Sequence, residues 1–405
     1  MKKLSYIAFI FILCLTFTLV ACGTGNITSG GSDNSSEITT PNTDDTSNPT
    51  DTGSTDTPSD TDTGSTDTPP DTGNTGDKTT DTNIYEVEAP GEGPASASNI
   101  SSVGGVPLVT LNNGVEMPRF GLGTQIQSLE SGDLGVLNRT SRTAVASALQ
   151  SGYRHLDTAH GYMNERGVGQ GIIDSGVPRE EIWLTSKLWP SDYSDAYNAV
   201  TEMLERLQVD YIDLVYLHHP AGSISLIESA WRDLETLYRE GKIRALGISN
   251  FDNRMEAFNA IMDEEIKPQV MQIECHPFAQ RTDTRALAEQ YNIQVECWYP
   301  LGHADQRLLN SDTLEAIAAN HGKSVVQIII RWHIQEGFSV IPGSTNADHI
   351  QENIEVFDFE LSDDEMELIR GMDEGDSGRY YNINYSGSIG NYFVNNAPRE
   401  WTGEF

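Results

Sequence analysis

The feature that most restricts the fold is a regular alternation, from Val106 onward, of short β-rich runs with longer amphipathic stretches. This alternation is typical of βαβ units, in which each helix carries the chain back to the next parallel strand. Eight such repeats favour a closed barrel over an open doubly wound sheet, and no G-x-G-x-x-G turn opens the first helix. The predicted fold class is therefore α/β, a (β/α)8 TIM barrel over residues 106–405.

Individual elements follow from composition and turn residues. Asn113-Gly114 is a strong turn signal and predicts an N-terminal β-hairpin from Val106–Leu111 and Val115–Pro118. The eight barrel strands are predicted at Phe120–Thr124, Tyr153–Ala159, Ile182–Leu188, Tyr211–His218, Ala245–Phe251, Val270–Pro277, Ile293–Tyr299 and Phe338–Gly343. The predicted helices include Arg142–Gln150, Ala196–Leu207, Leu226–Glu240 and Thr282–Gln290.

Residues 1–21 have the pattern of a secretory signal peptide. Lys2 and Lys3 precede the apolar run Leu4–Val20, and Leu19-Val-Ala-Cys22 resembles the lipobox of bacterial lipoproteins. This resemblance implies that Cys22 is lipidated and anchors an extracytoplasmic protein to the bacterial cell membrane. An ordinary signal peptide and a short transmembrane anchor are the alternatives, although a segment of 17 residues barely spans a bilayer.

Residues 22–105 follow the signal peptide and consist mainly of Thr, Asp, Ser, Gly, Pro and Asn. Near-repeats such as those beginning at Asp51 and Asp62 contain too few apolar groups to offset the entropy of ordering the chain. We therefore expect a disordered linker with a span of roughly 50 Å, which serves as a spacer and has no partner of its own.

Charge and cysteine content exclude some functions. The formal net charge is −35, whereas nucleic-acid binding depends on Lys and Arg side chains that neutralise phosphates, so we expect no nucleic-acid partner. Cys14 leaves with the signal peptide, and Cys275 and Cys297 are expected to be buried apolar residues in two strands. No His or Cys stands beside either at ligand spacing, so the sequence predicts neither a disulfide nor a metal site.

Four ionisable residues stand at or just beyond the ends of three successive predicted strands: Asp157, Tyr162, Lys187 and His218. Active sites of such barrels lie at this end, and the separations of 30 and 31 residues match one βα unit each. Carbonyl reduction by hydride needs a proton donor, and a phenol with a pKa of about 10 is weak unless a neighbouring ammonium stabilises its anion. Lys187 supplies the ammonium, Asp157 compensates its charge, and His218 orients the carbonyl oxygen.

Several segments resemble aldo-keto reductase signatures. They are Gly152–Ala159 with Tyr162–Glu165, Leu184–Trp189, Asp210–Pro220, Gly247–Phe251 and Gln272–Pro277. The resemblance extends over residues 106–375 in the family's order, and it implies that Asp157, Tyr162, Lys187 and His218 form the catalytic tetrad with Tyr162 as proton donor. It also implies a small-molecule carbonyl substrate, a nicotinamide cofactor and a monomeric barrel.

The same resemblance implies which residues bind the cofactor. They are Gly123, Thr124, Ser249, Asn250, Gln272, Trp298, Leu301, Gly302, Ser344, His349, Glu352 and Asn353. Ser249, Asn250 and Gln272 are expected at the nicotinamide carboxamide, and Trp298 stands where the family usually has a stacking Tyr. Gly343 and His349 replace the family's usual Lys and Arg, so NADP(H) is the expected cofactor and NAD(H) the alternative.

Substrate binding is less constrained by sequence. His219 stands where the family often has Trp, and the loop Gln125–Arg139 and the tail Arg379–Phe405 are expected at the rim of the pocket. The tail contains the aromatic residues Tyr380, Tyr381, Tyr385, Tyr392, Phe393 and Trp401. These side chains either bind a sugar or an aromatic aldehyde, or pack on the barrel.

An exported enzyme would need a source of reduced nicotinamide cofactor outside the cytoplasm. This cofactor is made in the cytoplasm, and a protein exported unfolded does not carry it across the membrane. Two other function classes are therefore considered. One is an extracytoplasmic ligand-binding or sensing lipoprotein without turnover, and the other is a structural protein displayed on a stalk.

Overall fold

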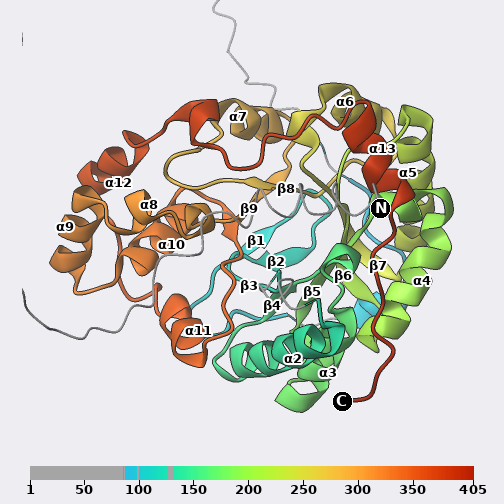
Figure 1. The fold of residues 1–405 in the computed structure, drawn as a ribbon, viewed down its shortest axis with the longest axis horizontal. Coiled ribbons are helices and arrows are strands. Elements are labelled where there is room, and N and C mark those ends of the chain that lie inside the picture. The colour runs from blue at the N-terminus through green and yellow to red at the C-terminus, as the bar shows by residue number, and fades with distance from the viewer. Residues whose placement is uncertain (1–84, 86, 98–99, 126–131) are drawn as a thin grey trace, which may run out of the picture. The chain divides into compact units, whose positions relative to one another are not determined.

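The computed structural model describes residues 85, 87–97, 100–125 and 132–405, and Figure 1 shows strands at the centre with helices around them. Eight strands form one parallel sheet in chain order, from β3 to β10. Their bounds are β3 Leu122–Gly123, β4 His155–Asp157, β5 Trp183–Leu188, β6 Ile212–Leu217, β7 Ile243–Ser249, β8 Val270–Glu274, β9 Gln294–Trp298 and β10 Ser339–Val340. Each predicted strand overlaps one of these, so the predicted barrel strands are confirmed.

The sheet closes on itself between its first and last strands. Phe120 forms a parallel bridge with Val340, and the backbone N–H of Gly121 donates to the Val340 carbonyl over 3.0 Å. The closed sheet leaves no free strand edge, and its side chains alternate between the interior and the surrounding helices. The predicted (β/α)8 barrel is therefore present.

The helices cover the outside of the barrel. Their bounds are α2 Leu134–Gln150, α3 Glu165–Ser175, α4 Ala196–Leu207, α5 Ile224–Arg239, α6 Met255–Asp263, α7 Thr282–Gln290, α8 Gln306–Leu309, α9 Asp312–His321, α10 Val325–Gln335, α11 Ala347–Ile354, α12 Asp363–Arg370 and α13 Ser388–Asn395. The short 3-10 helices are η1 Pro94–Ala97, η3 His160–Tyr162, η4 Arg179–Glu181, η5 Pro190–Asp195, η6 Phe251–Asn253, η7 Gly302–Ala304 and η8 Gly375–Gly378. Within the described residues, no helix is both long and apolar enough to span a membrane.

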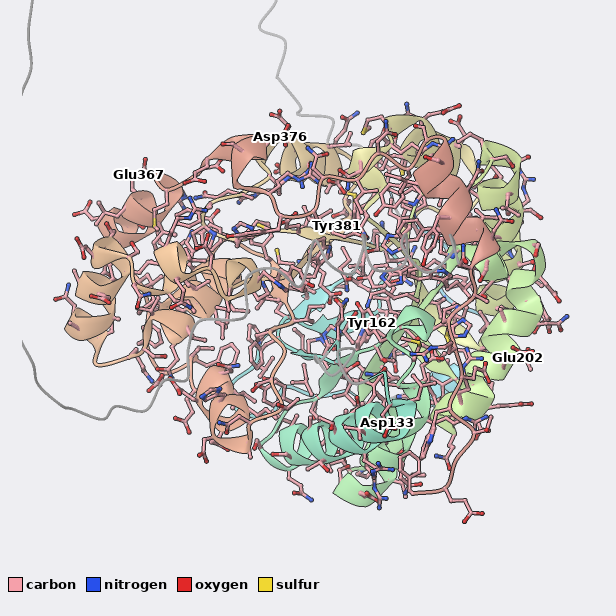
Figure 2. The ribbon with its side chains drawn as sticks, viewed as in Figure 1. Asp133, Tyr162, Glu202, Glu367, Asp376 and Tyr381 are labelled. Atoms are coloured by element: carbon pink, nitrogen blue, oxygen red, sulfur yellow. The ribbon has the colours of Figure 1, made fainter. Side chains whose placement is uncertain are left out.

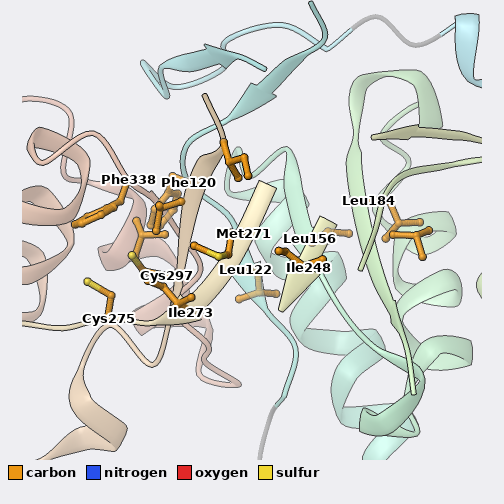
Figure 3. Packing of buried hydrophobic residues seen from close by; sticks show 14 of the residues in the cluster. Phe120, Leu122, Leu156, Leu184, Ile248, Met271, Ile273, Cys275, Cys297 and Phe338 are labelled. Atoms are coloured by element: carbon orange, nitrogen blue, oxygen red, sulfur yellow. The ribbon is translucent and has the colours of Figure 1, made fainter. Parts of the chain in front are cut away.

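The main apolar core lies between the barrel and its helices. Outward-facing strand residues such as Leu156, Leu184, Ile248 and Met271 are fully buried there, and Figure 3 shows several of them together. Burial of a side chain of this kind contributes about 1.5–3 kcal/mol. This packing fixes the strands and therefore the residues that face the interior.

The predicted hairpin closes the N-terminal end of the barrel. Strands β1 (Leu108–Thr110) and β2 (Glu116–Pro118) pair antiparallel. Met117 is fully buried in a separate cluster with Trp183, Leu214 and Val270, which face the barrel interior. The end near the N-termini of the strands is thus filled with apolar side chains, and polar chemistry is confined to the other end.

Part of the predicted linker belongs to the folded domain. The Gly91 N–H donates to the Tyr238 carbonyl over 3.0 Å, the Ala95 N–H donates to Gly241 over 3.1 Å, and Ala95 is only 2% exposed. The expected linker boundary at residue 105 is therefore too late, because backbone hydrogen bonds from residues 87–97 add to the barrel. The predicted signal peptide, Cys22 and the linker up to residue 84 lie outside the described residues.

Candidate functional site

The four predicted tetrad residues meet at the end of the barrel where the parallel strands terminate. Asp157 ends β4, Lys187 lies near the end of β5, His218 directly follows β6, and Tyr162 ends η3 in the loop after β4. Alternation along β4 and β5 turns Asp157 and Lys187 inward, while their neighbours Leu156 and Leu188 join the outer core. Figure 2 labels Tyr162 near the middle of the molecule.

The ammonium of Lys187 connects the site. Its Nζ donates to Asp157 Oδ1 over 2.6 Å, to the Thr158 carbonyl over 3.0 Å and to the Tyr162 hydroxyl over 3.1 Å. Lys187 is fully buried and Asp157 is 1% exposed. Burial lowers the pKa of Lys187 and raises the pKa of Asp157, and the contact between the two charges opposes both changes.

The phenol of Tyr162 is less acidic than the sequence suggested. Burial raises the pKa of Tyr162 well above its usual range, and the carboxylate of Asp157 acts in the same direction. Burial therefore opposes the stabilisation of the phenolate that Lys187 is expected to provide. Tyr162 therefore holds its proton firmly until a stronger base is present.

His218 is a neutral imidazole beside the phenol. Its ring centroid lies 5.7 Å from that of Tyr162, and it stacks on His219 at 4.2 Å. Burial lowers the pKa of His218 well below its usual value, with His219 and Lys187 adding to the effect. Nδ1 of His218 is buried without a hydrogen-bond partner among the described residues. A neutral ring of this kind can donate one N–H to a ligand oxygen.

A polar layer beneath the tetrad did not emerge from the sequence. Gln272 Nε2 donates to Asp157 Oδ2 over 2.8 Å and to Glu296 Oε2 over 2.5 Å, and the Tyr216 hydroxyl donates to the same Glu296 oxygen over 2.9 Å. Gly247 gives Tyr216 its space, because a Cβ there would lie 2.3 Å from the ring. The sequence did contain one indication of this layer, namely a glutamate, Glu296, within the otherwise largely apolar run Ile293–Tyr299.

The C-terminal tail is fastened to the rim of the site. Both oxygens of Glu274 accept backbone N–H groups, from Tyr380 over 2.6 Å and from Tyr381 over 2.9 Å. The Tyr385 hydroxyl lies 2.8 Å from His219 Nδ1, and the Tyr381 ring stacks on His219 with its centroid 6.3 Å away. The expected position of the tail at the pocket rim agrees with these contacts.

The aromatic residues of the tail divide by burial. Tyr385 and Phe393 are 1% and 3% exposed and pack on Ala221 and on the rim residue Trp189, whereas Tyr380 is 42% exposed. Packing therefore accounts for Tyr385 and Phe393. Of the loop expected at the rim, residues 126–131 lie outside the described residues, and residues 134–139 begin α2.

The residues expected at the nicotinamide end gather at the ends of β3 and β7 to β9. Asn250 Nδ2 donates to the His218 carbonyl and to Ser249 Oγ, over 3.0 Å in each case. Gln272, also expected there, donates its amide nitrogen within the barrel to Asp157 and Glu296. Thr124 is fully buried beside β4, where its N–H donates to the Asp157 carbonyl over 2.9 Å.

The residues expected along the rest of the cofactor lie after β9 and β10. Trp298 ends β9 half-buried, 5.5 Å from the Tyr381 ring, with its indole N–H unpartnered among the described residues. Leu301 and Gly302 follow β9 directly. Ser344 precedes α11, whose residues His349, Glu352 and Asn353 were also predicted.

The two cysteines have a third neighbour that the sequence did not reveal. Cys275, Cys297 and His333 of α10 are buried with their potential ligand atoms within 4.8 Å of one another. Figure 3 shows both cysteines among the apolar residues between barrel and helices. The His333 ring nitrogens lie 2.8 Å and 3.1 Å from the carbonyls of Ile329 and Cys275, so the backbone already holds this imidazole.

Comparisons with known proteins agree with this geometry. Residues 120–374 match the model of the aldo/keto reductase family. Glyoxal reductase of Bacillus subtilis is 43% identical over 269 residues, covering 66% of this chain and 92% of the relative. A 9,11-endoperoxide prostaglandin H2 reductase of Trypanosoma cruzi is 43% identical over 271 residues, covering 66% and 91%. Methylglyoxal reductase of Escherichia coli is 36% identical over 269 residues, covering 66% and 94%.

Solved structures give the same result. An aldo/keto reductase from Brucella melitensis is 39% identical with a TM-score of 0.61, covering 66% of this chain and all of that one. A Bombyx mori aldo-keto reductase solved in complex with NADP is 32% identical with a TM-score of 0.62, covering 69% and 95%. The segment that matches the family model contains both the barrel and the four residues at the strand ends. The chain therefore belongs to the aldo/keto reductase family.

Proposed function

We propose that this protein reduces aldehydes or ketones to alcohols by hydride transfer from a nicotinamide cofactor. The observation that carries the proposal is the position of Lys187 Nζ, which contacts both the Asp157 carboxylate and the Tyr162 hydroxyl. This arrangement places a proton donor next to a buried cation at the mouth of the barrel. Such pairing of donor and cation suits a reaction in which negative charge develops on a carbonyl oxygen.

Each tetrad residue has a separate task in this reaction. His218 donates a hydrogen bond to the carbonyl oxygen and aligns it beside Tyr162. Tyr162 passes its proton to the developing alkoxide, which is a stronger base than the phenolate left behind. Lys187 stabilises that phenolate, and Asp157 keeps Lys187 charged in a buried setting.

A nicotinamide cofactor fits the residues at the strand ends. Ser249, Asn250 and Trp298 offer hydroxyl, amide and indole groups there, and the unpartnered Trp298 N–H and His218 Nδ1 can meet a ligand. When bound, the reduced cofactor supplies the hydride. NADP(H) is the proposed form, as in the Bombyx mori complex.

NAD(H) is the alternative form because the adenosine end lacks the family's usual cations. Gly343 and His349 are both exposed, and a Cβ at position 343 would lie 2.9 Å from the Gly123 carbonyl oxygen. A Lys at position 343 would therefore require a backbone shift. His349 is then the residue of this segment that can carry a positive charge, in place of the Lys and Arg that the family usually has.

The proposed substrate is a small carbonyl compound such as a 2-keto compound or a sugar. Relatives named for glyoxal and methylglyoxal support this choice.

The test is cofactor oxidation by the purified full chain with glyoxal, methylglyoxal and a panel of sugars. Binding of NADPH and NADH is followed separately by fluorescence. Tyr162→Phe is expected to bind the cofactor normally and to lose about 100-fold or more in kcat, because only the donor hydroxyl is removed. Tyr299→Phe, a half-buried tyrosine after β9, is the matched control.

Three results would contradict the proposal in different ways. Full turnover by Tyr162→Phe would remove this residue from the chemistry. Cofactor binding by the wild type without turnover of any substrate would indicate the ligand-binding or sensing lipoprotein instead. Absence of cofactor binding by the wild type would favour a structural protein displayed on a stalk.

A further inference from the structure

A second buried carboxyl group lies beneath the tetrad. Glu296 on β9 is fully buried, and its Oε2 accepts hydrogen bonds from Gln272 and Tyr216. Its Oε1 has no hydrogen-bond partner among the described residues, and His155 Nε2 lies 3.4 Å away. One oxygen is thus satisfied twice, while the other faces only an imidazole nitrogen.

The tautomer of His155 follows from its other contact. His155 Nδ1 lies 3.0 Å from the Pro118 carbonyl oxygen, which can only accept, so Nδ1 carries the proton. In the neutral ring, Nε2 then presents a lone pair toward Glu296 Oε1 and toward the Thr185 hydroxyl at 3.3 Å. A carboxylate oxygen at Oε1 would face that lone pair with no proton between them, which is repulsive.

Glu274, the next buried glutamate along the barrel interior, shows the opposite pattern. Each of its oxygens accepts a backbone N–H of the tail, and the Arg379 guanidinium lies 3.9 Å away. These donors match an ionised carboxylate. Glu296 Oε1 has no such donors among the described residues, although Glu296 and Glu274 are both almost completely excluded from solvent.

We propose that Glu296 is a neutral carboxylic acid whose Oε1–H is directed at His155 Nε2, and that in this form it positions Gln272 and hence Asp157. Asp157 then carries the carboxylate charge that contacts Lys187 directly. Glu296 is a positioning residue, since it reaches the tetrad through Gln272. Its positioning role rests on the proposed function, whereas its protonation does not.

The surrounding charges favour this state. The ionisable and polar groups that face Glu296 come from four strands: His155 and Asp157 on β4, Lys187 on β5, Tyr216 on β6 and Gln272 on β8. One cation among them cannot compensate two buried carboxylates. Burial also raises the pKa of Glu296 and lowers the pKa of His155 to about 4, so both groups tend toward their neutral forms.

The direct test is infrared difference spectroscopy of the full-length protein at neutral pH. A protonated carboxylic acid has a C=O stretching band that carboxylates lack. Wild type minus Glu296→Gln is expected to show this band, and wild type minus Glu274→Gln, the matched control, is expected to lack it. Absence of the band from the Glu296 difference overturns the proposal.

A second readout concerns the histidine. Nitrogen NMR of histidine-labelled protein, assigned with His155→Gln, is expected to show a neutral ring protonated at Nδ1 with Nε2 as acceptor. A doubly protonated imidazolium would place the proton on His155 and overturn the assignment to Glu296.

The positioning role is tested by comparing two variants at one site. Glu296→Ala removes both contacts and is expected to lower kcat by about 100-fold, as for a misplaced catalytic group. Glu296→Gln keeps an acceptor for Gln272 and Tyr216 and a donor for His155, and is expected to restore most of the rate. Equal loss in both variants would contradict positioning by the neutral acid. If Glu296→Ala does not fold, the two spectroscopic readouts on wild type and Glu296→Gln still decide the protonation.

Discussion

Burial decides which single side chains in this barrel carry charge. The charges of Lys187 and Asp157 compensate each other, whereas Nε2 of the fully buried His155 lies 3.4 Å from Glu296 Oε1, which we assign to a neutral acid. Burial lowers the pKa of His155 to about 4 from its ordinary 6.5. The neutral ring is therefore the form that the folded state accommodates.

This pKa predicts an acid-dependent loss of stability. Because the unfolded chain binds a proton at His155 near pH 6.5 and the folded protein near pH 4, stability falls as pH decreases through this window. Between pH 7 and pH 5 this residue alone should lower the free energy of unfolding by about 2 kcal/mol. Denaturant unfolding at both pH values should show a loss smaller by that amount in His155→Gln than in the wild type.

The control for this prediction is His349→Gln, because His349 is exposed on α11. This variant should lose as much stability between the two pH values as the wild type. Identical losses in all three proteins would contradict the neutral assignment of His155.

The sequence was sufficient to identify the residues of the tetrad, but not the polar residues that lie beneath it in the barrel. Asp157, Tyr162, Lys187 and His218 could be found because each stands at a strand end or in the loop that follows. Glu296 and His155 lie inside strands, and their partners come from across the barrel interior. Alternation predicts that such residues face inward, but it does not indicate which ones meet.

At the scale of elements, helix α13 controls the shape of the site mouth. Phe393 on this helix lies 5.1 Å from the Trp189 ring and 4.7 Å from the His219 ring, measured between centroids. Figure 1 shows α13 near α5 at the edge of the barrel. The helix therefore holds the two rings that border His218.

Phe393→Ala is expected to loosen this helix, since truncation of a buried Phe costs about 3–5 kcal/mol. The KM for the carbonyl substrate should rise about tenfold with a smaller change in kcat, because the tetrad itself remains in place. Steady-state kinetics measure both constants. Ile389→Ala, on the exposed side of the same helix at 38% exposure, should change neither.

Element positions were predictable where periodicity is strong. Helices α4 and α7 have the predicted bounds, and every predicted strand overlaps an observed one. The tail was ambiguous because its aromatic residues have no periodic neighbours, and contacts with Trp189 and His219 settle the packing of Phe393. The end of the linker was also misjudged, since Gly- and Pro-rich residues 87–97 bind through backbone groups that composition does not reveal.

For the whole molecule, the lipid anchor remains a proposal, supported by the residues that end at Cys22. Cys22→Ser, expressed in a bacterium that processes lipoproteins, should lose incorporation of labelled fatty acid and move from the membrane fraction to the soluble fraction. Cys14→Ser is the control, because this residue lies within the predicted signal peptide and should leave lipidation unchanged. Membrane retention of Cys22→Ser with full labelling would contradict the lipobox.

The Cys22→Ser variant also tests whether catalysis depends on the lipid anchor. Cys22→Ser is expected to keep the wild-type rate of cofactor oxidation in detergent, because Cys22 lies outside residues 120–374, which contain the tetrad and match the family model. Loss of turnover in this variant would indicate that lipidation affects the fold.

The hairpin and the segment 87–97 meet at one pole of the barrel, where the Val87 N–H donates to the Asn112 carbonyl over 3.0 Å. The reactive residues occupy the other pole. Changes in the segment before residue 87 are therefore expected to leave the geometry of the reactive residues unchanged.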